Sequence, residues 1–134
     1  ANFIKLKSLY KSASASIVTE SIYSDGPGII TEKTLLAIAA KHPFMCIGHQ
    51  HIHKEIAERG FENYDEIFDL DYDVIESDFR LDAAIQMNLE TITSNNFDVG
   101  IAKEKAERNY DFLMNDYMQS IEDRANKQLR EIIR

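Results

Sequence analysis

The sequence predicts an α/β fold: a small parallel sheet of two or three strands with flanking helices and a long C-terminal helix. Residues 14–48 have the pattern of a strand, a loop, a helix and a second strand. Two strands joined through a helix pair in parallel with a right-handed connection, so this stretch predicts a βαβ core. From residue 100 onward, apolar residues recur every three or four positions, which predicts the helix.

Both strands are predicted from short apolar runs. Residues 15–20 contain the β-branched pair Ile17 and Val18 between small polar residues. Residues 44–47, FMCI, form a compact apolar run that Gly48 ends. The sequence SDGPG at 24–28 is typical of turns, so the chain is expected to leave the first strand through a loop.

The connecting helix is predicted from its ends. Thr31 is a suitable N-cap, and the carboxylate of Glu32 suits the positive end of the helix dipole. Pro43 cannot continue a helix, so the helix ends before it.

The remaining elements follow from periodicity and helix-ending residues. We expect a short helix over 2–12, a helix through Arg59, a third strand near 62–64, one helix from Ser77 or Asp78 to about Thr93, and the closing helix over 100–134.

A closing helix of about 30 residues would be about 45 Å long, which exceeds most dimensions of so small a domain. Its apolar residues are Ala106, Tyr110, Leu113, Tyr117, Ile121, Ala125, Leu129 and Ile132. Two interpretations stay open: packing on the core along the N-terminal half, or a homodimer interface along the C-terminal half.

The composition excludes several classes of partner. A chain of 134 residues is one domain, and its net charge of −8 argues against nucleic acid and anionic membranes as partners. Cys46 has no second cysteine to pair with, and this is typical of a cytoplasmic protein. No apolar run reaches membrane-spanning length.

Two patterns raise the question of metal binding. His49, His51 and His53 alternate after the second strand, but there is no HExxH motif, so we favour surface or ligand-facing histidines over a metal site. Asp69 begins a run that resembles a calcium loop. Val74 stands where that loop needs Gly and Arg80 where it needs Glu, so we favour a solvated acidic turn and predict no metal.

The start of the connecting helix is the candidate ligand site. Its free N–H groups lie beside the carboxyl end of the first strand, where open α/β sheets bind ligands. Glu32 could accept hydrogen bonds from hydroxyl groups and Lys33 could neutralise phosphate. His49 follows the second strand at the same edge. There is neither a Walker loop nor a GxGxxG motif, so an ordinary capped helix stays an alternative.

The order of motifs resembles the C-terminal region of glycosyltransferase-like proteins of phages and marine microbes. The motifs are Thr19-Glu20, the TEKT sequence at 31–34, Pro43-Phe44 to Gly48, Gly60-Phe61 and the acidic segment from Asp69 to Ile75. The likeness extends from about residue 14 to residue 92. More distantly, the TEK helix start is similar to the donor half of GT-B glycosyltransferases such as fucosyltransferases.

The resemblance implies a nucleotide-sugar site. The Glu and Lys of that motif face the sugar nucleotide in the family, which places Glu32 and Lys33 at a donor site with Thr19, Glu20 and Thr31 nearby. A complete GT-B enzyme has two domains, and this sequence begins with Ala1. Residues 1–134 are therefore expected to be a single α/β domain that is a fragment or the donor-side part of such an enzyme, with its catalytic residues unknown. The alternative is a non-catalytic α/β protein that homodimerises through its C-terminal helix.

Overall fold

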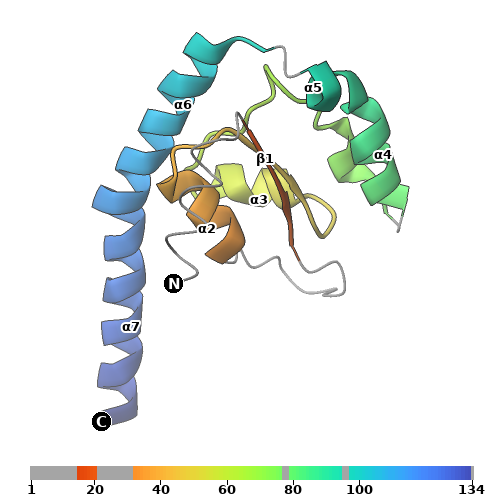
Figure 1. Cartoon of the computed structure of the whole chain (residues 1–134). Coiled ribbons are helices and arrows are strands. Elements are labelled where there is room, and N and C mark those ends of the chain that lie inside the picture. The colour runs from red at the N-terminus through yellow and green to blue at the C-terminus, as the bar shows by residue number, and fades with distance from the viewer. Residues whose placement is uncertain (1–14, 21–31, 77–78, 95–96, 134) are drawn as a thin grey trace, which may run out of the picture.

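The computed structural model describes residues 15–20, 32–76, 79–94 and 97–133. Two strands and a series of helices make up this mixed α/β fold, which is mostly helical (Figure 1). The elements are β1 (Ser16–Thr19), α2 (Glu32–Ala39), β2 (Phe44–Ile47), α3 (Ile52–Glu58), the 3₁₀ helix η1 (Asp71–Val74), α4 (Phe79–Met87), α5 (Leu89–Ser94), α6 (Val99–Phe112), the π-helix η2 (Leu113–Tyr117) and α7 (Met118–Ile133). The helix expected over 2–12, the loop at 24–28 and Thr31 lie outside the described residues.

The two predicted strands pair in parallel, as expected. Ser16 lies opposite Phe44 and Thr19 opposite Ile47. The pairing continues at both ends, where Ser16 N donates to the Pro43 carbonyl and Glu20 N to the Ile47 carbonyl, each at 2.8 Å. All four residues of β2 are buried, which its uniformly apolar sequence predicts, whereas Val18 is the buried residue of β1.

The prediction of a third strand near 62–64 is wrong, because this segment is irregular. The N–H of Glu62 donates to the Asn109 side-chain oxygen at 2.8 Å, and its carbonyl accepts from the Asn109 amide nitrogen at 3.0 Å. A helix side chain therefore satisfies the backbone groups that a neighbouring strand would otherwise bind. Among the described residues, the sheet has two strands.

The prediction of a single helix up to Thr93 is also wrong in one respect, because the structure has two helices there, α4 and α5, with a break between them. Asn88 lies at the break and is 2% exposed. Its side-chain oxygen accepts from Asp69 N at 2.7 Å, and its amide nitrogen donates to the carbonyls of Asp69 and Ala84, each at 2.9 Å. The amide thus fixes the acidic segment to the end of α4.

The long C-terminal helix is confirmed. The Asp98 side chain caps its start by accepting from Gly100 N and Ile101 N. Figure 1 shows α6 passing along one side of the body and α7 extending beyond it. The buried residues of α6 and η2 are Ala102, Lys105, Ala106, Asn109, Leu113 and Tyr117, whereas α7 has none. The expected core packing therefore ends with the wide turn of η2. The described part of the chain has no helix that is both long and apolar enough to span a bilayer.

Candidate functional site

The carboxyl ends of β1 and β2 carry the residues that the sequence singled out. Glu20 follows β1 and is only 5% exposed. Its Oε1 accepts the hydroxyl hydrogen of the buried Thr34 at 2.7 Å, so α2 supplies a hydrogen-bond donor to this carboxylate. A carboxylate is rarely buried unless it is hydrogen-bonded, so Glu20 is a specific feature of this edge.

The start of α2 lies at the same edge. Lys33 donates through Nζ to the Thr19 carbonyl at 3.4 Å, which brings the ammonium group to the end of β1. Glu32, the first residue of α2, is exposed. Four of the predicted site residues, Thr19, Glu20, Glu32 and Lys33, therefore lie on two elements that meet at the end of β1, and Thr31 is outside the described residues.

Gly48 follows β2 at a position with little room for a side chain. A Cβ atom on Gly48 would lie 2.8 Å from Ile52 Cδ1 and 3.0 Å from Glu20 Cβ. The second distance also shows that the two strand ends are closely packed. His49, the remaining predicted site residue, follows directly and is half-buried, with Nε2 3.1 Å from Glu55 Oε2 on α3.

Arg80 is a residue of this edge that sequence reasoning did not assign to a site. It lies on α4 and is 7% exposed, with Nε donating to the Gly48 carbonyl at 2.8 Å and Nη1 to the Ile75 carbonyl at 2.5 Å. The spacing of Arg80, Ala84 and Asn88 on one helical face can be read from the sequence, but only the structure shows that all three are buried. The edge thus combines a buried carboxylate, a buried guanidinium and Lys33.

The histidines do not converge. Residues His42 and His53 are buried, which corrects the expectation of surface or ligand-facing side chains for His53. His51 is exposed and has a left-handed backbone with φ of 67°. Across residues 15–20, 32–76, 79–94 and 97–133, no group of three or more His, Cys, Asp or Glu side chains could hold a metal ion.

His53 instead completes the outer edge of β2. Its Nε2 accepts from Cys46 N at 3.1 Å, while Nδ1 lies 2.7 Å from the Asn63 side-chain oxygen. The Asn63 amide nitrogen donates to the His53 carbonyl at 2.7 Å, so its oxygen is the acceptor for Nδ1–H. Nε2 also lies 2.9 Å from the Cys46 carbonyl oxygen and 2.8 Å from the Tyr72 hydroxyl oxygen. The Tyr72 hydroxyl donates to the Cys46 carbonyl at 2.5 Å, and burial raises the pKa of Tyr72.

Cys46 is not placed as a nucleophile. Burial raises the pKa of its thiol to about 12, and the charges of Glu20 and Asp73 act in the same direction, against the hydrogen bond from Thr34. The thiol sulfur lies 3.7 Å from the Thr34 hydroxyl oxygen. A thiol with so high a pKa stays protonated at neutral pH and is therefore unreactive.

The acidic segment is not the fully solvated turn that the sequence predicted. Asp73 is buried, with Oδ2 accepting from His53 N at 2.9 Å and its carbonyl accepting from His51 N at 2.9 Å. The carboxylate therefore caps the start of α3, whose preceding residue supplies no side-chain cap. Asp69 and Asp71 are exposed, as expected for the segment.

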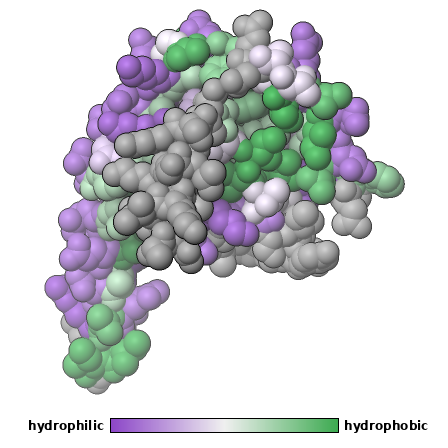
Figure 2. All heavy atoms as spheres, viewed as in Figure 1, coloured by the Kyte–Doolittle hydropathy of each residue, from purple (hydrophilic) through white to green (hydrophobic). Residues whose placement is uncertain are grey.

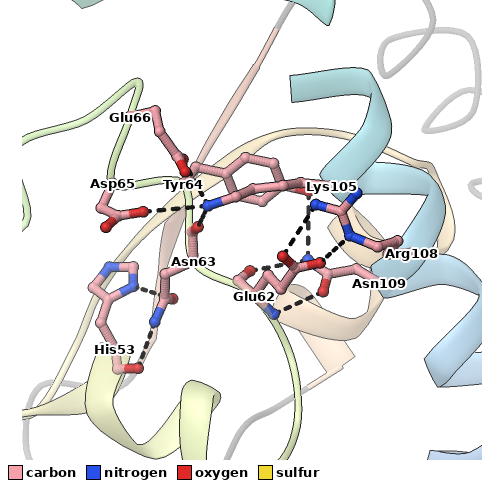
Figure 3. A network of polar contacts seen from close by, with 9 residues as sticks. All are labelled: His53, Glu62, Asn63, Tyr64, Asp65, Glu66, Lys105, Arg108 and Asn109. Atoms are coloured by element: carbon pink, nitrogen blue, oxygen red, sulfur yellow. Dashed lines mark hydrogen bonds and ion pairs between the residues drawn. The ribbon is translucent and has the colours of Figure 1, made fainter. Parts of the chain in front are cut away.

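A polar network attaches the segment after α3 to α6 (Figure 3). Lys105 is its centre: Nζ donates to the Asn63 carbonyl at 2.6 Å, to Glu66 Oε2 at 2.6 Å and to Asp65 Oδ1 at 3.2 Å. Arg108 binds both carboxylate oxygens of Glu62. The arrangement is structural, since each of these charged groups is used in joining two parts of the fold.

No family model, no curated protein and no solved structure matches the chain.

Proposed function

We propose that the carboxyl edge of the β1–β2 pair binds a nucleotide sugar, and that the chain is the donor-side part of a glycosyltransferase of the type found in phages and marine microbes. The observation that carries the proposal is the buried carboxylate of Glu20, held by Thr34 at the end of a parallel strand. This is the edge of an α/β sheet where ligands bind.

The chemistry of the edge fits such a ligand. A nucleotide sugar combines hydroxyl groups with a diphosphate, so it needs both carboxylates and cations. Exposed Glu32 would accept hydrogen bonds from ribose or sugar hydroxyls, and Lys33, one residue later on α2, would neutralise the diphosphate. Thr19, Thr31 and His49 would border the ligand.

Arg80 would act on the ligand through the backbone. Both of its hydrogen bonds go to carbonyl groups, one of them that of Gly48 at the end of β2. It therefore holds the Gly48–His49 turn beside Glu20. The acceptor site and any general base would lie outside this chain. The lone cysteine, Cys46, fits a location in the reducing cytoplasm.

Isothermal titration with UDP-, GDP- and ADP-sugars tests the proposal directly. At least one nucleotide sugar is expected to bind, and Glu32→Ala and Lys33→Met are each expected to weaken binding about tenfold or more, as the loss of one charged hydrogen bond does. Both residues are exposed, so neither substitution should disturb the core.

Glu58→Ala is the matched control, because Glu58 is exposed at the far end of α3 and outside the edge. It should leave the affinity unchanged. Binding that survives both Glu32→Ala and Lys33→Met would refute the assignment of the site. If no nucleotide sugar binds, the proposed function itself is wrong, and the result favours the alternative of a non-catalytic α/β protein.

A further inference from the structure

One exposed face of α7 is apolar. Met118, Ile121 and Leu129 are 50%, 41% and 54% exposed, and Ile132 is 79% exposed. Together with Ala125 they recur every three or four residues, which places them on one side of the helix. Met114, on the turn before α7, is 46% exposed and extends the row. We call this row, Met114 to Ile132, the apolar stripe.

Figure 2 shows hydrophobic residues gathered at the free end of α7, with hydrophilic residues along most of the rest of the helix. The stripe does not face the body. Leu113 and Tyr117, the residues that pack on the core, are neighbours of Met114 and Met118 on the adjacent side of the helix. A second surface can therefore contact the stripe without displacing the body.

The charges of the helix divide into two blocks. Residues 111–123 contain four acidic residues, Asp111, Asp116, Glu122 and Asp123, and no Lys or Arg. Residues 124–133 contain three basic residues, Arg124, Lys127 and Arg130, and one acidic residue, Glu131. A second copy of the helix lying antiparallel would place each basic block beside an acidic block, whereas a parallel copy would place like charges together.

We propose that the stripe binds the stripe of a second copy of this chain, with the two helices antiparallel. The two-fold axis would pass near residue 123, where the charge changes sign. In this register Met118 faces Leu129 of the other copy, Ile121 faces Ala125 and Met114 faces Ile132. Each apolar residue of the stripe then meets another apolar residue, so sequence pattern and charge pattern specify the same register.

The two bodies lie at opposite ends of the helix pair in this arrangement. The body contacts the helix along residues 102–117. The antiparallel register places residues 102–112 of the second copy beyond the free end of α7, and residues 113–117 beside residues 129–133. The interface is limited to one helix from each copy, so it is smaller than the roughly 800 Å² per partner of a standard complex. We therefore expect a dissociation constant in the range of roughly 10–500 μM.

Sedimentation velocity across a concentration series up to about 1 mM tests the association. The wild-type chain should pass from monomer to dimer, and Ile121→Gln and Leu129→Gln should each weaken dimerisation about tenfold or more. Ser120→Gln is the matched control, since Ser120 is exposed and lies about 140° around the helix from Ala125. A chain that stays monomeric over the whole range refutes the proposal, as does a dimer that both stripe variants leave intact.

Variants with one added cysteine test the orientation. A mixture of Met118→Cys and Leu129→Cys chains should form a mixed disulfide under mild oxidation, while neither variant alone should form a covalent dimer. The native Cys46 is buried and does not interfere. Self-crosslinking of each variant alone would show a parallel pair and overturn the antiparallel register. Because these tests need no nucleotide sugar, they are independent of the proposed function.

Discussion

The imidazole of His53 accepts a hydrogen bond from the backbone N–H of Cys46, 3.1 Å away, at the outer edge of β2. In a wider sheet, this N–H would bind the carbonyl of another strand. A side chain from α3 takes that role, and the Tyr72 hydroxyl serves the carbonyl of the same residue.

His53→Ala is expected to lower the free energy of unfolding by about 2–4 kcal/mol, because it leaves the N–H of Cys46 without a partner and opens a cavity. Urea denaturation followed by circular dichroism measures the loss. Lys54→Ala, an exposed change on the next residue of the same helix, is the control and should stay within about 0.5 kcal/mol of the wild type. Equal effects of the two substitutions would show that the hydrogen bond of His53 contributes nothing.

Asn109→Ala should lower the free energy of unfolding by about 2–3 kcal/mol, because both backbone groups of Glu62 lose their partner. Asn109 is 2% exposed, so water cannot readily replace the amide. Arg108→Ala removes a partly exposed ion pair with the same Glu62 and should have a marginal effect on the free energy of unfolding. Chemical denaturation of both variants makes the comparison, and a larger loss for Arg108→Ala would contradict it.

Lys105 gives stability a defined pH dependence. Burial alone would raise the pKa of Asp65, but the hydrogen bond and charge of Lys105 hold it below its usual 3.8. The ion pair therefore stabilises the fold above pH 3.8, and this contribution is lost as the pH falls through the lowered folded-state value. The stability difference between wild type and Lys105→Met should accordingly shrink between pH 7 and pH 3.

The contribution of Lys105 to stability should also be lost at high pH. Burial lowers the pKa of Lys105, but its hydrogen bonds to Glu66 and Asp65 raise it above 10.5. Its contribution is complete below pH 10.5 and is lost as the pH rises through the folded-state value. Urea midpoints of both proteins across the pH range test the profile, and a constant difference at all pH values would refute it.

Cys46 should resist thiol reagents in the folded protein. Its thiol pKa is about 12 and its side chain is buried, so a colorimetric disulfide reagent at pH 8 is expected to react only as fast as the protein unfolds. One thiol per chain should appear at once in denaturant. Rapid labelling of the native chain would show that the core opens around β2.

Gly60→Ala is expected to lower the free energy of unfolding by about 1–3 kcal/mol. Gly60 has a φ of 102°, and a Cβ there would lie 2.6 Å from Phe112 Cζ. Gly100→Ala is the matched control, because Gly100 lies in the first turn of α6 and its nearest contact is Asp98 Oδ1 at 3.3 Å. The control should be near neutral by thermal melting.

The sequence predicted those parts of the fold that depend on local pattern. The apolar run at 44–47 and the Ile17–Val18 pair indicated the parallel strands, and the period of the last helix indicated its length. The errors arose where one buried amide replaces a backbone partner: Asn109 substitutes for a strand beside Glu62, and Asn88 interrupts a helix. Such contacts join residues about 20 to 50 apart, so no local propensity reveals them.

The candidate site was predicted in a similar way. Lys33 and His49 were singled out because one begins a helix and the other follows a strand, positions that pattern alone identifies. Glu20 was included only because the resemblance to glycosyltransferase-like proteins implied it. Arg80 was missed because its partners are carbonyl groups, and any residue can supply a carbonyl. Thr34 was quoted as part of a motif, yet its bond to Glu20 depends on how α2 packs against β1.

The side chains that cover the outer edge of β2 also protect the protein against aggregation through this apolar strand. A four-residue run of Phe, Met, Cys and Ile is the kind of segment that recruits identical strands into aggregates when its edge is open. His53 and Tyr72 occupy the N–H and carbonyl at Cys46, so an incoming strand finds no continuous ladder there. Loss of either side chain should therefore make the protein aggregate sooner in concentrated solution. The effect should be larger than its lowered free energy of unfolding alone would cause.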